Sequence, residues 1–503
     1  MNITEHLERD RKFFPQGIAL RFEGQEFTYK HLDELVNRMA NGLRSLGIEK
    51  GDRVALFLPN IPEFVIAYLG ILKIGAVTVS LNVMLKQDEV LFILNDCEAK
   101  AMVTTEELRA EIPLDDLVHL EHILITEGNT EKDMSLSRLL ARMSTSAKAI
   151  SMQPQEPAAI IYTSGTTGFP KGATLSHGNV VSNMHSVKHN CHIQRNDKLL
   201  LYLPLFHCFG QNFILNGGLN AAATIVLQRR FEPEKLADIL QNEGITMFFG
   251  VPTVFAKLLE MQLSPLALRT VRYFFSAAAV LPAELTKQWQ QQYGQWVHEG
   301  YGLTETSPFS CYNHDLYYKL GSIGMPIENV EMQVVDDDGE LLPPDEVGEL
   351  VIRGPNVMLG YFNNPDETDK VLKDGWFHSG DLGYMDEDGY FYIVDRLKDM
   401  INKSGFKVYP AEVERVLYQH PDVVEAAVYG VPDPVKGEEV KAKVRLKAGR
   451  YLNAEALRAF CADRMAKYKV PNFIEFVESL PKNATGKILK RVLREEELAL
   501  QKQ

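Results

Sequence analysis

The chain has 503 residues, of which 45% are hydrophobic, and it carries a formal net charge of −14. This length and apolar content suffice for a large core, and the usual range of domain sizes predicts two to four structural units. The negative charge argues against nucleic acid as a partner and against general attraction to anionic lipid. Only a local basic face could bind such a partner.

The charge is unevenly divided along the chain. Residues 1–395 carry 32 basic and 52 acidic side chains, a net charge of −20, whereas residues 396–503 carry 21 and 15, a net charge of +6. The sequence therefore predicts a cationic C-terminal unit attached to an acidic body.

The cysteines and the N-terminus predict a cytoplasmic protein. The five cysteines are scattered and never in CxxC spacing, which is typical of reduced thiols rather than of disulfides or a zinc site. The N-terminus lacks an apolar signal segment, and the apolar run at 61–81 is interrupted by Glu63 and Lys73. We expect at most peripheral membrane contact, and the oligomeric state stays open.

Helical and strand patterns alternate through the first 302 residues. Residues 28–46 place apolar side chains on one helical face, and the apolar run VALFLP follows at 54–59. Similar short apolar runs recur at 199–204, 223–228, 246–252, 273–278 and 297–302, most of them separated by segments of helix length. This alternation predicts an α/β fold with parallel sheets covered by helices on both faces.

The pattern changes twice toward the C-terminus. After Gly321, short β-like pieces with Asp-Gly turns at 338–339 and 388–389 predict hairpins and a small barrel or curved sheet. Beyond DRLKD at 395–399, strand and helix patterns mix compactly over about one hundred residues, a plausible size for a domain. We predict an N-terminal domain at 1–394 with the small β-barrel near 321–394, a hinge at 395–400, and an α+β lid domain at 401–503.

The stretch YTSGTTGFPKG at 162–172 is rich in groups that bind phosphate. It supplies hydroxyls, backbone N–H groups freed by glycine, and one cation: Thr163, Ser164, Gly165, Thr166, Thr167, Gly168 and Lys171. A solvated loop is the alternative for such a string alone. The preceding apolar segment AAIIYT and the helix-like start at 176–179 favour a phosphate-binding loop. The stretch is not a P-loop, because Pro170 stands where that motif needs glycine, and it is not a GxGxxG fingerprint.

Six further motifs follow in order, and together they resemble one family. They are LPLFHCFG at 203–210, YGLTET at 301–306, GELVIRGPNVMLGY at 348–361, WFHSGDLG at 376–383, DRLKDMINKSGFKVYP at 395–410 and PKNATGKILKR at 481–491. With the 162–172 stretch, they resemble the adenylate-forming superfamily of acyl-CoA synthetases, non-ribosomal peptide adenylation domains and firefly luciferase. Within that superfamily, the sequence most resembles bacterial medium- and long-chain fatty acid ligases.

The resemblance implies a fold and a reaction. The fold would be a large N-terminal domain of two doubly wound βα subdomains plus a small β-barrel, followed by a mobile α+β C-terminal domain. The reaction would use ATP and Mg²⁺ to convert a carboxylic acid to acyl-AMP, and then pass the acyl group to a phosphopantetheine thiol. Because a carboxylate is a poor electrophile, activation must come first, and positioning and charge neutralisation carry that step.

The resemblance also implies roles for individual residues. The 162–172 loop with Lys171 would hold the β- and γ-phosphates, Thr163 and Glu305 the Mg²⁺, with Thr304 beside them. Asp381 and Arg396 would hold the ribose, and Lys487 would reach the substrate carboxylate and the α-phosphate. Adenine would lie among Ala277, Ala278, Glu299, Gly300, Tyr301, Gly302 and Ile393. Without the family, Glu305 and Lys487 would read as solvated charges and Tyr301 as a core aromatic.

The second half-reaction is expected to need a domain rotation. Lys398 matches the family's hinge position, and after rotation Gly405 and Lys407 would line the path of the thiol. The acyl pocket would be bordered by His207, Phe209, Gly210, Gln211 and Ala279. His207 stands where amino-acid-activating relatives usually place an aspartate, so an α-amino acid is disfavoured.

The acceptor and the activity leave alternatives open. CoA is favoured because no insertion is evident between 321 and 395, and the cationic lid would attract either CoA or an acidic acyl carrier protein. The alternatives are an acid ligase that loads acyl carrier protein and an inactive nucleotide-binding or scaffolding relative. Chain length, and alkyl against aryl acid, do not follow from the sequence, since a buried methylene contributes only about 0.8 kcal/mol.

Overall fold

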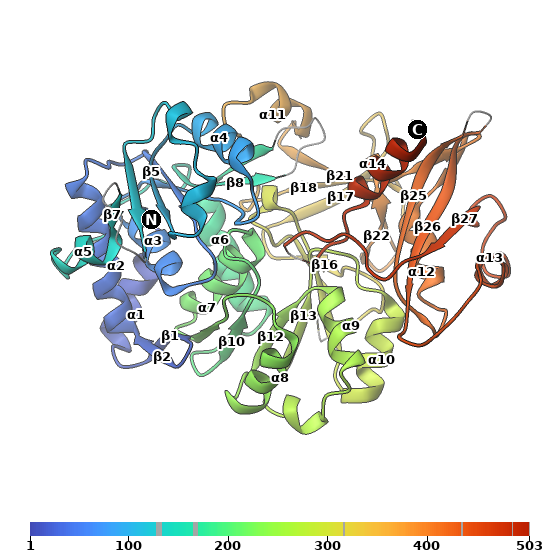
Figure 1. Ribbon diagram of the computed structural model, residues 1–503, viewed down its shortest axis with the longest axis horizontal. Coiled ribbons are helices and arrows are strands. Elements are labelled where there is room, and N and C mark those ends of the chain that lie inside the picture. The colour runs from blue at the N-terminus through green and yellow to red at the C-terminus, as the bar shows by residue number, and fades with distance from the viewer. Residues whose placement is uncertain (127–132, 164–169, 315–316, 434–435, 485, 502–503) are drawn as a thin grey trace.

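The computed structural model describes residues 1–126, 133–163, 170–314, 317–433, 436–484 and 486–501. Two large sheets form the N-terminal part of the molecule, and a third sheet and a separate C-terminal domain follow (Figure 1). The α/β class is thus confirmed. Within those ranges, no helix is long and apolar enough to cross a bilayer.

The first sheet has eight strands. Its order is β19 (Gly360–Tyr361), β9 (Lys171–Ser176), β8 (Pro157–Thr163), β4 (Val77–Ser80), β3 (Arg53–Phe57), β5 (Ala99–Thr104), β6 (His122–Ile125) and β7 (Met134–Ser135). The strands from β8 to β7 pair in parallel, whereas β9 and β19 are antiparallel additions at the β8 side. The described ends of the YTSGTTGFPKG stretch, residues 162–163 and 171–172, therefore lie on two hydrogen-bonded strands, β8 and β9.

The second sheet has nine strands. Its order is β16 (Met325–Pro326), β15 (Cys311–Tyr312), β14 (Val297–Tyr301), β13 (Tyr273–Ser276), β12 (Met247–Gly250), β10 (Lys198–Leu201), β11 (Thr224–Leu227), β1 (Ile18–Phe22) and β2 (Gln25–Thr28). The run from β14 to β1 is parallel, as the repeated apolar segments predict.

Helices cover these sheets. They are α1 (Glu5–Phe13), α2 (Tyr29–Ser45), α3 (Pro62–Lys73), α4 (Gln87–Asp96), α5 (Leu136–Ala141), α6 (His177–Asn190), α7 (Asn216–Asn220), α8 (Pro233–Asn242), α9 (Pro252–Glu260) and α10 (Ala283–Tyr293). In α2, the hydroxyl of Thr28 caps the helix by accepting from the His31 N–H at 3.1 Å, and Leu32, Val36 and Met39 are buried.

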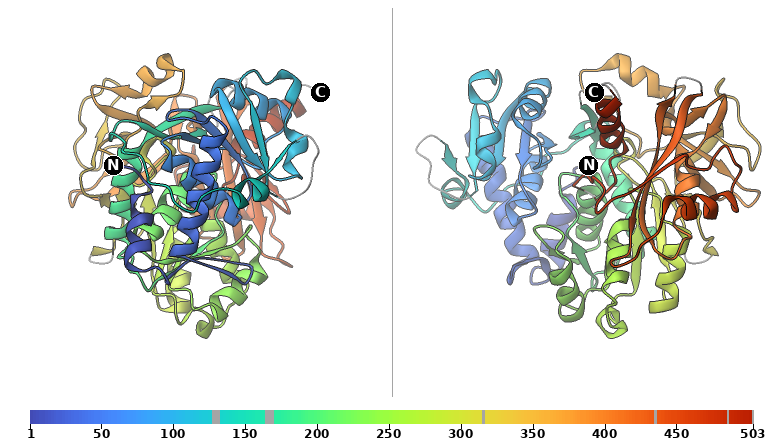
Figure 2. Two further views of the ribbon diagram at one scale, coloured as in Figure 1. Left: turned by 90° about the vertical axis from the view of Figure 1, so that its left-hand side faces the viewer. Right: turned by 45° about the vertical axis from the view of Figure 1, so that its right-hand side comes forward.

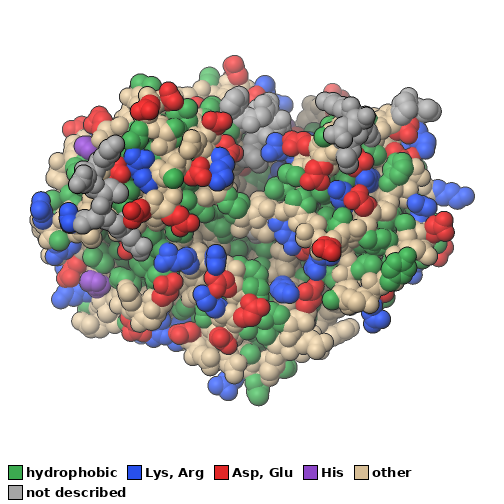
Figure 3. All heavy atoms as spheres, viewed as in Figure 1, with side chains coloured by type: hydrophobic (Ala, Val, Ile, Leu, Met, Phe, Trp, Pro, Cys, Tyr) green, Lys and Arg blue, Asp and Glu red, His purple; other side chains and the backbone are tan. Residues whose placement is uncertain are grey.

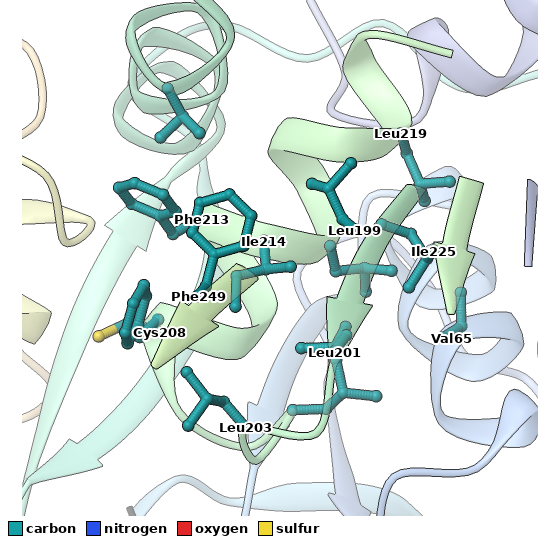
Figure 4. Packing of buried hydrophobic residues seen from close by; sticks show 14 of the residues in the cluster. Val65, Leu199, Leu201, Leu203, Cys208, Phe213, Ile214, Leu219, Ile225 and Phe249 are labelled. Atoms are coloured by element: carbon teal, nitrogen blue, oxygen red, sulfur yellow. The ribbon is translucent and has the colours of Figure 1, made fainter. Parts of the chain in front are cut away.

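The apolar run at 61–81 is α3 followed by β4, and it belongs to the core. Every residue of α3 except Glu63 is buried, including Lys73, whose Nζ lies 3.0 Å from Asp33 and 3.1 Å from Glu8. A buried ammonium requires such partners. Figure 4 shows the core nearby, where Val65 of α3, Leu199 and Leu201 of β10 and Ile225 of β11 pack together.

The region expected to form a small barrel is an antiparallel five-stranded sheet. It comprises β17 (Glu331–Val335), β18 (Gly348–Arg353), β20 (Leu372–Lys373), β21 (Trp376–Met385) and β22 (Phe391–Arg396), with α11 (Pro365–Val371) beside it. Strand β21 pairs with β18, β20 and β22. The register of β21 and β22 places Asp381 opposite Arg396.

The C-terminal domain is an α+β unit. Its sheet comprises β23 (Ile401–Lys403), β24 (Phe406–Val408), β25 (Val423–Asp433), β26 (Gly437–Leu446) and β27 (Phe473–Phe476), and its helices are α12 (Pro410–Leu417), α13 (Ala454–Ala462) and α14 (Lys490–Gln501). Alternate residues of β25 face opposite sides: Ala426 and Val428 join one apolar cluster, and Ala427 and Tyr429 join another. Both faces of the sheet are therefore buried.

The predicted hinge at 395–400 covers the last two residues of β22 and the turn that leads to β23, and its hinge role stays a prediction. Figure 2 shows the C-terminal domain beside the second large sheet and close to α9 and α10. On the face shown in Figure 3, acidic and basic side chains are interspersed rather than gathered by sign.

Candidate active site

The strand ends position most of the predicted site residues. Thr163 ends β8, Tyr301 ends β14, and the segment 277–279 follows β13 directly. Because the carboxyl ends of parallel strands lie at one edge of a sheet, residues distant in sequence converge there. The loop residues Ser164, Gly165, Thr166, Thr167 and Gly168 lie outside the described residues.

A carboxylate, a phenol and a guanidinium form the polar centre of the site. The Tyr301 hydroxyl donates to Asp381 Oδ2 at 2.7 Å, and Arg396 Nε lies 2.9 Å from Asp381 Oδ1. Asp381 is buried, and its carboxylate raises the pKa of Arg396, which keeps that side chain charged. Three segments, β14, β21 and β22, thus meet on one buried negative charge. Ile393 lies on β22, half-buried, opposite Gly383.

The segment 277–281 is held against β14 by Glu299. Its Oε1 accepts from the Leu281 N–H at 2.9 Å, while the Ala277 N–H donates to the Gly250 carbonyl at 3.2 Å. Burial raises the pKa of Glu299 to about 8. Ala278 has a φ of +69°, a value that a non-glycine residue rarely adopts. Ala277, Ala278 and Ala279 remain partly exposed.

Two glycines of the YGLTET region are required by close contacts. A Cβ at Gly300 would lie 2.2 Å from the Phe275 ring, and a Cβ at Gly302 would lie 1.4 Å from the Pro308 carbonyl oxygen. No side chain fits at either position. These glycines let Tyr301 approach the polar centre while the backbone on either side stays packed.

Lys171 and Glu305 are linked through Tyr361 and Glu367, two residues for which no role is predicted from the sequence. Lys171 forms an ion pair with Glu367 of α11 and lies 5.3 Å from the Tyr361 ring centroid, and Tyr361 donates to Glu305 Oε1 at 2.9 Å. Hydrogen bonds from Lys171 and Lys370 lower the pKa of Glu367 to about 2.

Tyr361 is the last residue of the motif GELVIRGPNVMLGY, and Glu367 follows it by six residues. Their position beside this motif is the feature of the sequence that could have pointed to them. The Thr163 hydroxyl donates to the Lys171 carbonyl at 3.5 Å. Lys171, Thr163 and Glu305 therefore lie around one region of the site.

The motif LPLFHCFG forms a buried turn into a π-helix, Phe209–Leu215. The His207 Nδ1 accepts from the Phe209 N–H at 3.2 Å, so this nitrogen acts as an acceptor. Burial, and then the charge of Lys487, lower the pKa of His207 to about 4, so the ring is neutral near pH 7. Thr304 lies beside Cys208, the residue after His207, and its Oγ1 is 3.5 Å from Cys208 Sγ.

Gly210 and Gln211 make close structural contacts, and their place at the border of the acyl pocket stays a prediction. A Cβ at Gly210 would lie 2.3 Å from the Pro204 carbonyl oxygen, so the absent side chain makes room for backbone rather than for substrate. Gln211 is buried and donates to Ser80 Oγ at 2.8 Å and to the Leu205 carbonyl at 3.1 Å. Phe209 packs on Phe213 and Phe275.

Lys487 comes from the C-terminal domain and lies close to the polar centre. Its backbone N–H donates to Asn483 Oδ1 at 2.9 Å. Burial and the nearby Arg396 charge lower the pKa of its ammonium to about 8, and the Asp381 carboxylate opposes them. The structure thus places Lys487 near Asp381 and Arg396, and the roles of the three residues stay predictions.

Gly405 and Lys407 are not part of this convergence. Both are exposed on the β23–β24 hairpin, and Gly405 has a φ of +86°. Lys398 lies in the single turn Leu397–Asp399 between β22 and β23, also exposed. Their predicted thiol-path and hinge roles require another arrangement of the domain and stay predictions.

This fold is that of a two-domain α/β enzyme, in which Lys487 of the smaller domain lies near Asp381 and Arg396 of the larger one. Family comparison identifies it. The family model described as AMP-binding enzyme matches residues 7–362, and the one described as AMP-binding enzyme C-terminal domain matches residues 412–487. The chain belongs to the AMP-binding enzyme family, whose members related to this chain are CoA ligases.

Curated relatives match along nearly the whole chain. A long-chain-fatty-acid–CoA ligase of Bacillus subtilis (strain 168) is 36% identical, covering 96% of this chain and 92% of the relative. A feruloyl-CoA synthase of Amycolatopsis sp is also 36% identical, covering 97% of each. The same family thus accommodates both alkyl and aryl acids at similar distance from this sequence.

Solved structures show the same fold. The anthranilate CoA ligase AuaEII in complex with anthranoyl-AMP superposes with a TM-score of 0.93 at 30% identity, covering 100% of this chain and 98% of that one. ATP-bound MatB from Rhodopseudomonas palustris superposes at 0.91 with 32% identity, and its apo form at 0.82 with 33%, each covering 99% of both chains. The chain therefore superposes more closely on the ATP-bound form than on the apo form.

Proposed function

We propose that the protein activates a medium- or long-chain fatty acid with ATP, releasing pyrophosphate, and then transfers the acyl group from acyl-AMP to CoA. One observation carries the first step: Lys487 of the C-terminal domain lies close to the Asp381–Arg396 pair of the N-terminal domain. A mobile cation beside a sugar-binding carboxylate is the arrangement that acyl-AMP formation needs.

Asp381 is the candidate ribose acceptor. An ionised carboxylate can accept both hydroxyl groups of a ribose, and Asp381 is oriented by Tyr301 and Arg396 on its two oxygens. The segment 277–281, fixed by Glu299, supplies backbone groups at the adenine side. These contacts fix the orientation of the Asp381 carboxylate and of the segment 277–281.

Glu305 and Thr163 fit a site for Mg²⁺. Magnesium prefers hard oxygen ligands and is usually held by one or two carboxylates together with substrate phosphates. Glu305 is buried, and Tyr361 orients one of its oxygens at 2.9 Å. A bound Mg²⁺ would neutralise phosphate charge, and Lys171, now paired with Glu367, would turn to the phosphates.

The chemistry assigned to this chain is positioning and charge stabilisation. A substrate carboxylate oxygen attacks the α-phosphorus, the bond to the bridging oxygen breaks, and pyrophosphate leaves with its electron pair. The Lys487 ammonium would attract the substrate carboxylate and offset the charge that develops on the α-phosphate. His207 is neutral near pH 7 and adds no charge beside the carboxylate.

The fatty acid assignment rests on the relative named for long-chain fatty acids and on the absence of a fixed anion at 206–207. An aryl acid is the second candidate, favoured by the feruloyl-CoA synthase at equal identity. The acceptor assignment to CoA rests on the relatives' names and on the net charge of +6 of residues 396–503, from 21 basic and 15 acidic side chains. Acyl carrier protein would be attracted by the same charge, and a cytoplasmic location would suit either acceptor.

A substrate panel tests the proposal. Purified protein with ATP and Mg²⁺ is given fatty acids of increasing length, ferulate, benzoate and α-amino acids, with CoA or phosphopantetheinylated carrier protein in parallel. We expect acid-dependent pyrophosphate release that is largest for fatty acids, and thioester only with CoA. Release that is largest for ferulate would replace the fatty acid assignment, and no release with any acid would reject the function.

Asp381→Asn should weaken ATP binding by about 10²-fold. The amide keeps the size of the side chain but replaces an acceptor oxygen by a donor, so one ribose hydroxyl and either Tyr301 or Arg396 lose a partner. We expect KM for ATP to rise by about 10² while KM for the acid changes less than threefold. Asp386→Asn, in the neighbouring turn and paired with Lys319 at the surface, is the matched control. An unchanged KM for ATP would exclude the ribose role.

A further inference from the structure

Two polar contacts join the C-terminal domain to the two ends of helix α9. At its first turn, the Thr253 hydroxyl donates to the Gly486 carbonyl at 3.3 Å. At its last residue, Glu260 Oε1 lies 3.4 Å from Arg445 Nη2 on β26. Figures 1 and 2 show the C-terminal domain beside the part of the N-terminal domain that carries α9 and α10. Gly486 directly precedes Lys487, so the first contact lies next to the predicted catalytic lysine.

Close packing reinforces the contact at Gly486. This glycine has a φ of +84°, and a Cβ there would lie 3.0 Å from Thr253 Oγ1 and 3.3 Å from Val251. A side chain at this position would be strained by its backbone and would push the loop away from α9. The loop that carries Lys487 therefore lies directly on the start of α9.

The contact at Glu260 connects to the base of the same loop. Arg445 Nε lies 2.9 Å from Glu425, and Lys482, which begins the loop, also pairs with Glu425. The Glu425 side chain is only 6% exposed, so this buried carboxylate orients both cations. Glu260 connects this charge cluster to the N-terminal domain, where it also lies 3.4 Å from Lys257 Nζ of the same helix.

We propose that Glu260 and Thr253 are positioning residues that hold the C-terminal domain where Lys487 faces the nucleotide, and so favour acyl-AMP formation over thioester formation. The inference rests on the proposed function. A rotation about 395–400 that withdraws Lys487 must also separate these contacts, so they stabilise one arrangement only. Arg445 and Glu260 are 27% and 30% exposed, and such ion pairs are weak enough to be released in each turnover.

The two half-reactions measured separately test the kinetic part. We expect Glu260→Gln and Thr253→Val each to slow acid-dependent ATP–pyrophosphate exchange by about threefold, and Glu260→Arg, which adds repulsion toward Arg445, by about tenfold. Single-turnover thioester formation from preformed acyl-AMP should stay within twofold of the wild type or become faster. Equal losses in both half-reactions, or unchanged exchange in Glu260→Arg, would overturn the proposal.

Two controls separate the contact from a general effect. Glu284→Arg reverses a charge on the neighbouring helix α10, where Glu284 pairs with Lys287 at 3.0 Å, and it should leave exchange unchanged. In an Arg445→Gln background, Glu260→Gln should have no further effect, because a double-mutant cycle isolates the pair. Additive losses would overturn the assignment of Arg445 as the partner.

A conformational readout keeps this test independent of catalysis. The five native cysteines are buried, so cysteines introduced at Gln291 on α10 and at the exposed Lys467 of the C-terminal domain can be labelled with a donor and an acceptor fluorophore. Glu260→Arg should shift the transfer-efficiency distribution without ATP, whereas Glu284→Arg should not. An unshifted distribution would overturn the inference even if the wild type activated no acid, a result that would reject only the proposed function.

Discussion

Lys487→Ala should slow acyl-AMP formation by about 10²–10³-fold while leaving thioester formation from preformed acyl-AMP nearly intact. The loss follows because a preorganised cation beside the reacting phosphate stabilises charge that appears only in the transition state. The measurement is ATP–pyrophosphate exchange for the first half-reaction and a single-turnover assay with acyl-AMP and CoA for the second.

Lys467→Ala is the matched control for this substitution. Lys467 belongs to the same domain and is exposed, so its removal changes the charge of the domain by the same amount without touching the site. Exchange by Lys467→Ala should remain within twofold of the wild type. A loss of both half-reactions in Lys487→Ala would contradict a role confined to adenylation and would indicate damage to the domain.

The pKa of Lys487 predicts the pH dependence of the same step. In the enzyme without ATP, burial and Arg396 lower this pKa to about 8. Below that pH the Lys487 amine carries its positive charge, and above it the charge is lost. The kcat/KM for ATP in the exchange reaction should therefore be flat below pH 8 and fall about tenfold per pH unit above it. Lys487→Arg should move the fall to higher pH, because a guanidinium stays charged. A wild-type profile that is flat from pH 7 to 10 would contradict this.

Lys398→Pro should slow thioester formation by about 10²-fold and change adenylation by less than threefold. Proline fixes φ near −65°, a value close to that of the 3₁₀ turn Leu397–Asp399 in which Lys398 lies. The substitution is therefore compatible with the present arrangement and opposes the backbone change that would expose the thiol path. Single-turnover transfer from acyl-AMP to CoA measures the loss.

Lys398→Ala separates the backbone from the side chain in this experiment. It removes the ammonium and keeps φ free, so it should retain thioester formation within about threefold. Comparable losses in exchange and in thioester formation for Lys398→Pro would exclude a hinge at this residue. A loss as large in Lys398→Ala would assign the effect to the side chain instead.

Much of the polar centre could be predicted from sequence motifs. Asp381, Arg396, Tyr301 and Lys487 each lie in a recognisable motif. In the structure, Tyr301 and Arg396 each contact Asp381, and Lys487 lies nearby. The motifs carry this information because strand ends and tight turns impose local sequence requirements, such as the glycines beside Tyr301 that no other residue can replace.

Other parts of the site left no local signal. Glu367 pairs with Lys171 across 196 positions, and Glu260 meets Arg445 across 185. A carboxylate that pairs over such a distance has the same appearance in the sequence as one that faces solvent. Gly210 is a further example, because the close approach of the Pro204 carbonyl that requires a glycine there is visible only in the folded chain.

The sequence by itself determined the α/β class and the sheet-forming apolar runs, because apolar residues recur at the period of each helix and strand. It also determined the family, because the motifs occur in order. Only the tertiary structure decided which charges meet. The register of β21 on β22 sets Asp381 opposite Arg396, and the docking of the C-terminal domain on α9 brings Lys487 to them. Such contacts depend on how whole elements pack, and packing is a property of the folded chain rather than of any stretch of it.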